Sequence, residues 1–200
     1  MEILLLLAIG ILLPLVGQPQ AIDVTEFSPN STLFINKYIE FSKSSVSVDF
    51  DSILLASRQS TFRKLGDREM ILLGYDPDFY WYRFSISNQK PLEQRVMLLL
   101  TQLAVREMEI FQGVNGQWAS LGKTGYQYPF ESRPYQYAHF VYPITVPPHS
   151  TSEFYVQVDD SHSYKVIAFA LLHPVMLNGF QQGFYFFFGF MIGIMLLFFP

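Results

Sequence analysis

EMEIFQGVNGQWASLG, residues 107–122, is the stretch that decides the fold of this 200-residue chain. In its first part, acidic and apolar residues alternate, and this period of two is typical of a β-strand with one buried face. Asn115-Gly116 is the dipeptide favoured in a type I′ turn, because both central positions of that turn need a positive φ. The stretch therefore predicts a β-hairpin whose return strand begins near Trp118.

The same alternation continues on both sides of the hairpin, and turn residues interrupt it about every 8 to 12 residues. We predict further strands at TLFINKYIEFSK (32–43), FYWYRFSISN (79–88), EQRVMLLLTQL (93–103), YAHFVYPITV (137–146), EFYVQVDD (153–160) and YKVIAFALL (164–172). Short antiparallel strands in this number favour an all-β fold of two packed sheets, a jelly-roll-like β-sandwich. We place this domain at residues 22–176.

Two segments inside the domain depart from simple alternation. Residues 93–103 are almost continuously apolar, so this strand is expected at the centre of a sheet with both of its faces covered. Residues 48–66 show no clear pattern, but Asp51 could cap a short helix over residues 52–56. This would be the only helix in the domain.

Both ends of the chain are apolar. Ile3–Val16 is shorter than the ~20 residues that a transmembrane helix needs, so we predict a signal peptide or N-terminal anchor over residues 1–21. Residues 184–200 carry no charge and have no polar face, and a helix that is apolar all round belongs in lipid. We expect residues 177–200 to form a transmembrane helix, or the start of one, in a lipid bilayer.

Composition and motifs argue against several functions. The net charge of −4 comes without a basic cluster, which argues against binding to nucleic acid. There is no cysteine, and the four histidines lack metal-ligand spacing, so we predict neither thiol chemistry nor a metal site. No Walker, Rossmann or Gly-x-Ser-x-Gly pattern occurs, so we predict no cofactor and no catalytic residue. Glu107 and Glu109 share a strand face and could form a glycosidase pair, but a solvated strand face explains them more simply.

Aromatic and cationic residues gather around two of the predicted strands and the segment that follows the hairpin. Sugar rings stack on Trp and Tyr while Arg side chains hydrogen-bond hydroxyl groups, so this combination is typical of a carbohydrate site. The alternative is that the rings fill the core of the sandwich. The predicted ligand-binding residues are Trp81, Arg83, Trp118, Tyr126, Tyr128, Arg133 and Tyr137.

The order of these pieces resembles a known family. YWYRFSISN (80–88), the hairpin (107–125), YPFESRPYQYAHFVYPITVPP (128–148) and EFYVQVDDSHSYKVIAFAL (153–171) are similar to extracellular domain 2 of bacterial seven-transmembrane receptors with diverse intracellular signalling modules. The resemblance implies a jelly roll like that of carbohydrate-binding modules, on the periplasmic side of the inner membrane. It also implies that the domain senses a small-molecule or carbohydrate ligand and signals to further transmembrane helices and a cytoplasmic output module outside this chain. The family's residue after the hairpin glycine is usually acidic but is Lys123 here, which puts a shared ligand in doubt.

We therefore expect the periplasmic sensor domain of a membrane signalling receptor, present here as its N-terminal portion and without enzymatic activity of its own. One alternative is a membrane-tethered carbohydrate-binding or adhesion protein without signalling, and a weaker one is a glycosidase-like enzyme. The sequence leaves open the ligand, the output module and whether the chain forms a homodimer.

Overall fold

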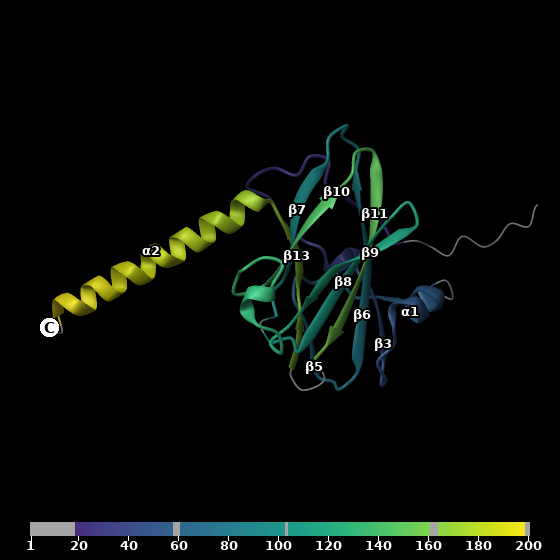
Figure 1. The fold of residues 1–200 in the computed structure, drawn as a ribbon, viewed down its shortest axis with the longest axis horizontal. Coiled ribbons are helices and arrows are strands. Elements are labelled where there is room, and N and C mark those ends of the chain that lie inside the picture. The colour runs from purple at the N-terminus through teal and green to yellow at the C-terminus, as the bar shows by residue number, and fades with distance from the viewer. Residues whose placement is uncertain (1–18, 58–60, 103, 161–163, 199–200) are drawn as a thin grey trace, which may run out of the picture.

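The computed structural model describes residues 19–57, 61–102, 104–160 and 164–198. Two β-sheets pack face to face, with one helix beside the outer side of the larger sheet and a second, long helix that projects away from the side of the smaller sheet (Figure 1). The predicted β-sandwich is thus confirmed. The predicted signal peptide falls largely outside the described residues.

The larger sheet has seven strands. Its order is β4 (Arg63–Lys64), β3 (Glu40–Ser44), β6 (Phe79–Asn88), β11 (Ser150–Asp159), β8 (Glu107–Val114) and β9 (Gln117–Thr124), and β1 (Ile22–Asp23) also pairs with β6. The two long strands β6 and β11 form its centre, and β1 is parallel to β6 whereas the other pairs are antiparallel. Long strands at the centre and solvent-exposed strands at the edges are expected of a sheet that buries one whole face.

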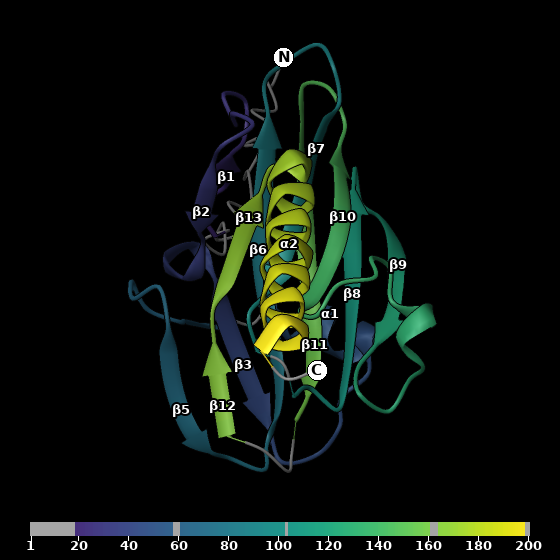
Figure 2. The same ribbon diagram turned by 90° about the vertical axis from the view of Figure 1, so that its left-hand side faces the viewer.

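The second sheet has four strands in the order β10 (Phe140–Val146), β7 (Gln94–Leu100), β13 (Phe169–Leu172) and β2 (Thr32–Phe34). A small two-stranded sheet joins β5 (Ile71–Tyr75) to β12 (Tyr164–Ile167) at one end of the sandwich (Figure 2). Counted along the chain, β2, β6, β7, β8, β9, β10, β11 and β13 are strands 1 to 8, and the two sheets then have the orders 1-8-3-6 and 2-7-4-5. This is the order of two Greek keys wound into a jelly roll.

The core lies between the two sheets, where the inward residues of each strand meet. Along β6 the residues Tyr80, Tyr82, Phe84 and Ile86 point inward, while Phe154, Val156 and Val158 do so along β11. Each strand supplies every second residue to this core, as the period of two predicts.

The predicted hairpin is confirmed as β8 and β9. Asn115 and Gly116 have φ of 51° and 79°, both positive as the type I′ turn requires. Met108 and Ile110 are buried in the core, so Glu107 and Glu109, which alternate with them, face outward.

The strand predicted at 32–43 is wrong, because the chain crosses there from one sheet to the other. A 3₁₀ helix, η1 (Asn36–Tyr38), separates β2 from β3. The physical cause is Asn36, whose buried amide donates to the carbonyls of Arg68, Glu69 and Ile167 and accepts from the N–H of Phe169. A side chain that bonds four backbone groups fixes the chain in this turn.

The single strand predicted at 164–172 is also wrong, since β12 and β13 belong to different sheets. The break falls at Ala168, whose carbonyl accepts hydrogen bonds from the N–H and the hydroxyl of Thr101. The hydrogen bonds from Thr101, the residue that follows β7, therefore determine where the chain stops pairing with β5 and begins to pair with β7.

The predicted short helix is present as α1 (Phe50–Ser57), but its cap is different. Asp49, not Asp51, accepts from the Ser52 N–H at 2.9 Å and from the Ser52 hydroxyl at 2.8 Å. α1 is not the only helix of the domain, because η1 and a second 3₁₀ helix, η2 (Phe130–Ser132), are also present.

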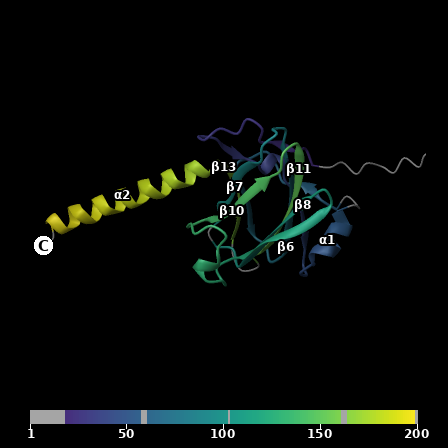
Figure 3. The same cartoon turned by 45° about the horizontal axis from the view of Figure 1, so that its top comes forward.

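α2 (Pro174–Phe198) leaves the sandwich on the side of the four-stranded sheet, opposite to α1 (Figures 1 and 3). Over the part of the chain that the structure describes, no helix satisfies both the length and the hydropathy of a membrane span. The transmembrane prediction for residues 177–200 is therefore not confirmed.

Candidate functional site

The four-stranded sheet is apolar on its outer face as well as on its inner face. Met97, Val141, Leu172 and Leu177 form a buried cluster there, and the partly buried Leu99, Tyr135 and Tyr137 pack against it. This confirms that β7 is central and covered on both faces, as its continuous apolar run predicts. The cover consists of the first turns of α2 and the segment before β10.

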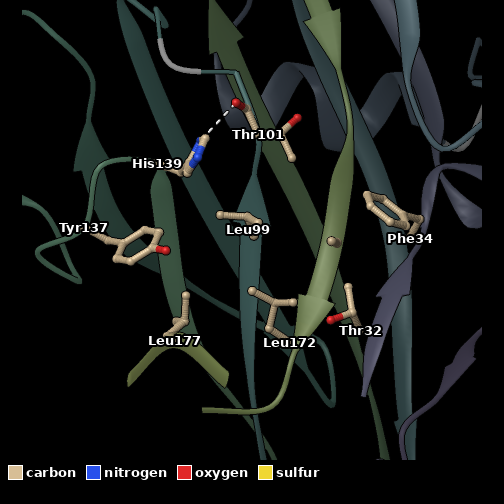
Figure 4. A pocket seen from close by; sticks show the side chains of 9 residues that line it. Thr32, Phe34, Leu99, Thr101, Tyr137, His139, Leu172 and Leu177 are labelled. Atoms are coloured by element: carbon tan, nitrogen blue, oxygen red, sulfur yellow. Dashed lines mark hydrogen bonds between the residues drawn. The ribbon is translucent and has the colours of Figure 1, made fainter. Parts of the chain in front are cut away.

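This cover is incomplete and leaves a pocket of about 260 Å³ at the root of α2 (Figure 4). The strands supply its floor, and α2 and the segment before β10 supply one side. Its lining residues are Thr32, Phe34, Leu99, Thr101, Tyr137, His139, Ala170, Leu172 and Leu177. None of them carries a formal charge except His139 when it is protonated.

Strand register orders the pocket along β7. Leu172 pairs with Thr32 at one end, Ala170 lies between Leu99 and Phe34 in the middle, and Thr101 follows at the other end. His139 directly precedes the residue that pairs with Leu100, so it lies beside Thr101. The pocket therefore has an apolar middle, with Thr32 at one end and Thr101 with His139 at the other.

The polar end is built around one hydrogen bond. His139 Nδ1 lies 3.1 Å from the carbonyl oxygen of Thr101 (Figure 4). A carbonyl oxygen only accepts, so Nδ1 carries the proton and the neutral ring presents Nε2 as an acceptor. Within the described residues, Nε2 has no hydrogen-bond partner.

Arg133 fixes the backbone of the segment that precedes His139. Its Nη1 donates to the carbonyls of Tyr137 at 2.6 Å and Ala138 at 3.0 Å, and its guanidinium lies over the rings of Phe130 and Phe140. Tyr137 itself lines the pocket, and burial raises the pKa of its hydroxyl. Of the predicted site residues, Tyr137 therefore lines the pocket, and Arg133 contacts the backbone of the segment that carries it.

Trp81 and Arg83 lie on the other side of the molecule, on the outer face of the seven-stranded sheet beneath α1. Trp81 is 1% exposed and donates from Nε1 to the carbonyl of Val48. Arg83 forms an ion pair with Glu40 at 2.7 Å, donates to the carbonyl of Ser57 and stacks on Phe62. These contacts leave Trp81 no open ring face for a ligand.

Trp118 belongs to the same outer face. Its ring lies over Gly113, where a Cβ would approach to 2.7 Å, and it packs edge-on against Phe50 and Tyr155. Phe50, from α1, stacks on Phe111 with ring centroids 4.1 Å apart. The aromatic residues of this face thus form a layer that α1 covers.

Tyr128 contacts a group of charged residues at the far edge of that layer. Its hydroxyl donates to Glu107 at 2.8 Å, and Lys123 bridges Glu107 and Glu109 at 3.3 and 3.5 Å. Burial raises the pKa of Glu107, but hydrogen bonds from Tyr128 and Lys123 outweigh it and lower the pKa overall. Tyr126 is 54% exposed and does not belong to the pocket lining.

The seven predicted residues therefore do not converge on one surface. Most of the pocket was missed by sequence reasoning, including Thr32, Phe34, Leu99, Ala170, Leu172 and Leu177. The available signal was the apolar run in β7, because a strand covered on both faces needs a second apolar surface beyond the core.

No curated protein sequence matches the chain significantly. Among solved structures, a GH31 α-xylosidase from Xanthomonas citri is similar at 10% identity and a TM-score of 0.31, over 78% of this chain and 15% of that chain. A carbohydrate-binding module, CBM28, specific for non-crystalline cellulose, is similar at 12% identity and a TM-score of 0.26, over 51% of this chain and 69% of that chain.

A family profile described as 7TMR-DISM extracellular 2 matches residues 38–171. These residues contain both central strands of the larger sheet, the hairpin, and the strands β7 and β10 of the smaller one. Thr32, Phe34, Leu172 and Leu177 of the pocket lie outside the match. The match covers about two thirds of the chain, and the chain therefore belongs to the family of 7TMR-DISM extracellular 2 domains.

Proposed function

We propose that this chain is the ligand-sensing, extracytoplasmic part of a membrane signalling receptor, and that its ligand acts in the pocket at the root of α2. The observation that carries the proposal is the presence of Leu177, from α2, in the same lining as residues of three strands. A ligand there contacts the sandwich and the helix together. It therefore favours one packing of α2 on the sheet over others, which is what a sensor needs.

α2 is proposed to enter the inner membrane, with the sandwich in the periplasm. Its 25 residues correspond to about 37 Å, against about 30 Å for the hydrocarbon core of a bilayer. Apolar side chains along its outer half are exposed on all sides, namely Phe186, Phe187, Phe188, Phe190, Met191, Ile192 and Met195. Such a surface is stable in lipid, and further transmembrane helices and a cytoplasmic output module are its proposed partners.

The test is whether occupancy of the pocket changes the position of α2. The chain has no cysteine, so Ala119→Cys on β9 and Ile192→Cys on α2 give a pair of unique sites for spin labels. The distance distribution between them is measured in nanodiscs with and without glucose, cellobiose or octanoate. A second sample carries Thr32→Trp, which places an indole at the rim of the pocket from an exposed edge-strand position.

We expect at least one of these compounds to shift the distribution, and Thr32→Trp to remove that shift. Thr32→Ser is the matched control and should respond like the wild type. A distribution that no compound changes, or a shift that survives Thr32→Trp, would contradict the proposal.

A carbohydrate bound at the edge of the aromatic layer is a second candidate. It is favoured by the half-buried Trp118 ring, which lies on the same hairpin as Glu107, Glu109 and Lys123, so that this hairpin offers both a stacking surface and hydrogen-bonding groups. A glycan panel followed by tryptophan fluorescence tests it, with Trp118→Ala as the variant. Absence of a glycan response in the wild type would dismiss this candidate without affecting the pocket.

A further inference from the structure

The chemistry of the pocket lining points to one class of ligand, and this inference rests on the proposed function because it concerns the same pocket. The lining offers a long apolar middle made by Phe34, Leu99, Ala170 and Leu172. At the Thr101 end the ring of His139 presents Nε2, which has no partner among the described residues, and the hydroxyls of Tyr137 and Thr32 are the other polar groups of the lining.

A sugar ring fits this lining poorly. It carries hydroxyl groups around its whole edge, and each hydroxyl that is buried without a partner loses the hydrogen bonds it made to water. The hydroxyl of Thr101 already donates to Ala168, and the carbonyl of Thr101 is already bound to His139. Among the described residues no Asp, Glu, Lys or Arg lines the pocket, so a metal ion finds no carboxylate ligand and a phosphate finds no permanently charged partner.

The shape of the pocket gives its size limit. Its contents lie along β7 between the level of Leu172 and that of Thr101, roughly 13 Å at about 3.3 Å per strand residue. A cavity of about 150 Å³ holds a benzene molecule, so 260 Å³ accommodates on the order of ten non-hydrogen atoms. A space of this length and volume accommodates one unbranched chain of that size.

We propose that the pocket binds a medium-chain amphiphile, a fatty acid or fatty alcohol, with its chain over Leu99 and Ala170 and its oxygen head group at His139. Nε2 of the neutral ring accepts a hydrogen bond from an alcohol, and the protonated ring donates one to a carboxylate. The alkyl chain of the ligand then reaches Leu177, so its length determines how it contacts the first turns of α2.

The experiment measures binding of radiolabelled octanoate and 1-octanol by equilibrium dialysis against the full chain held in an amphipol. Glucose and cellobiose serve as competitors. We expect one octanoate or octanol molecule per chain, no competition by either sugar, and loss of binding in Thr32→Trp. His139→Phe keeps a ring of similar size but removes the head-group partner, and should weaken binding roughly tenfold.

Ala170→Phe fills the middle of the pocket and should abolish binding, whereas Ala119→Phe, at an exposed position of β9, should leave it unchanged. Thr32→Trp keeps the test decisive if Ala170→Phe fails to fold, because Thr32 is exposed on an edge strand. Failure of both amphiphiles to bind, binding that survives Thr32→Trp, or displacement by a sugar would overturn the proposal.

An acyl chain of a bilayer lipid is another source of the same chemistry. Native mass spectrometry of the wild type against Thr32→Trp identifies by mass which molecule occupies the pocket. The outcomes also separate the two proposals. Octanoate that binds without moving the spin label on α2 contradicts the sensor mechanism alone, and a sugar that shifts the label through the pocket contradicts the ligand class alone.

Discussion

On the outer face of the seven-stranded sheet, α1 covers a layer of aromatic rings that fill the space between helix and strands. On the side of the four-stranded sheet, α2 leads away from the strands after its first turns (Figure 1). A pocket lies beside Leu177, where α2 begins. Both faces are apolar, and both carry a helix. The difference lies in how far each helix covers its sheet.

This contrast separates residues that stabilise the fold from residues available to a ligand. The rings of Trp81, Phe111 and Tyr155 are packed against one another and against Phe50 of α1. Leu99, Ala170 and Tyr137 face a space that no side chain of the described residues fills. A cluster of aromatic residues therefore indicates only the face that α1 closes, on the seven-stranded sheet. The face open to a ligand, on the four-stranded sheet, is recognised by its incomplete cover.

The largest expected effect tests the closed face directly. Trp81→Ala should lower the free energy of unfolding by about 3–5 kcal/mol, because a fully buried indole leaves a cavity beneath α1. Leu99→Ala, on the open face, is the matched comparison and should lower it by about 1 kcal/mol, since part of its side chain already faces the pocket. Urea unfolding followed by far-UV circular dichroism measures both, and equal losses would remove the contrast between the two faces.

A smaller loss is expected when the ion pair beneath α1 is broken. Arg83→Met should destabilise the protein by about 2–3 kcal/mol, because Glu40 and the carbonyl of Ser57 lose their partner in a mostly buried site. Adding Glu40→Gln should recover part of this loss, since the remaining group is then uncharged. A double variant whose loss in free energy of unfolding exceeds the sum of the losses of the two single variants would be inconsistent with this account.

Acid should lower the free energy of unfolding, because the carboxylate of Asp76 becomes protonated. Burial raises the pKa of Asp76, but hydrogen bonds from Lys43, from the Asp78 N–H and from Tyr80 outweigh it and hold the pKa at about 2. A carboxyl whose pKa is lowered by folding contributes stability above its unfolded value of about 4, and loses it as the pH falls to about 2.

The expected loss between pH 4 and pH 2 is therefore about 2 kcal/mol. It is measured as the pH dependence of the urea midpoint, with Asp76→Asn as the control. The variant should be less stable at neutral pH and should show a shallower slope in this window. An unchanged slope in Asp76→Asn would assign the acid sensitivity to other groups.

The smallest effect concerns the edge of the aromatic layer. A Cβ at Gly113 would lie 2.7 Å from the ring of Trp118, so Gly113→Ala should push the indole outward and cost about 1–2 kcal/mol. Iodide quenching of tryptophan fluorescence should increase, because Trp118 becomes more exposed while Trp81 stays buried. Amphiphile binding on the opposite face should not change, and a change there would show that the two faces are coupled.

The sequence predicted those elements whose signal is local. Asn115-Gly116 specified the hairpin because only a turn with two positive φ values fits between the alternating strands. The continuous apolar run of β7 correctly indicated a strand covered on both faces, and the number of short strands indicated the sandwich.

Where the prediction failed, a distant partner was decisive. Asn36 breaks the stretch 32–43 because it bonds backbone groups more than 30 residues away, and Ala168 ends β12 because Thr101 takes its carbonyl. The predicted cap of α1, Asp51, and the observed cap, Asp49, differ by only two residues, a difference that periodicity does not resolve.

For the candidate site, the sequence alone determined that aromatic and apolar residues exceed what one core requires. Only the tertiary structure decided which of them are closed in and which face an open pocket. Trp81 and Tyr137 are both aromatic residues of predicted strands, yet α1 covers the first completely, whereas the second packs beside Leu177 of α2 and faces the pocket. The physical reason is that side-chain pattern fixes which face of a strand is apolar, whereas the cover over that face depends on where distant helices pack.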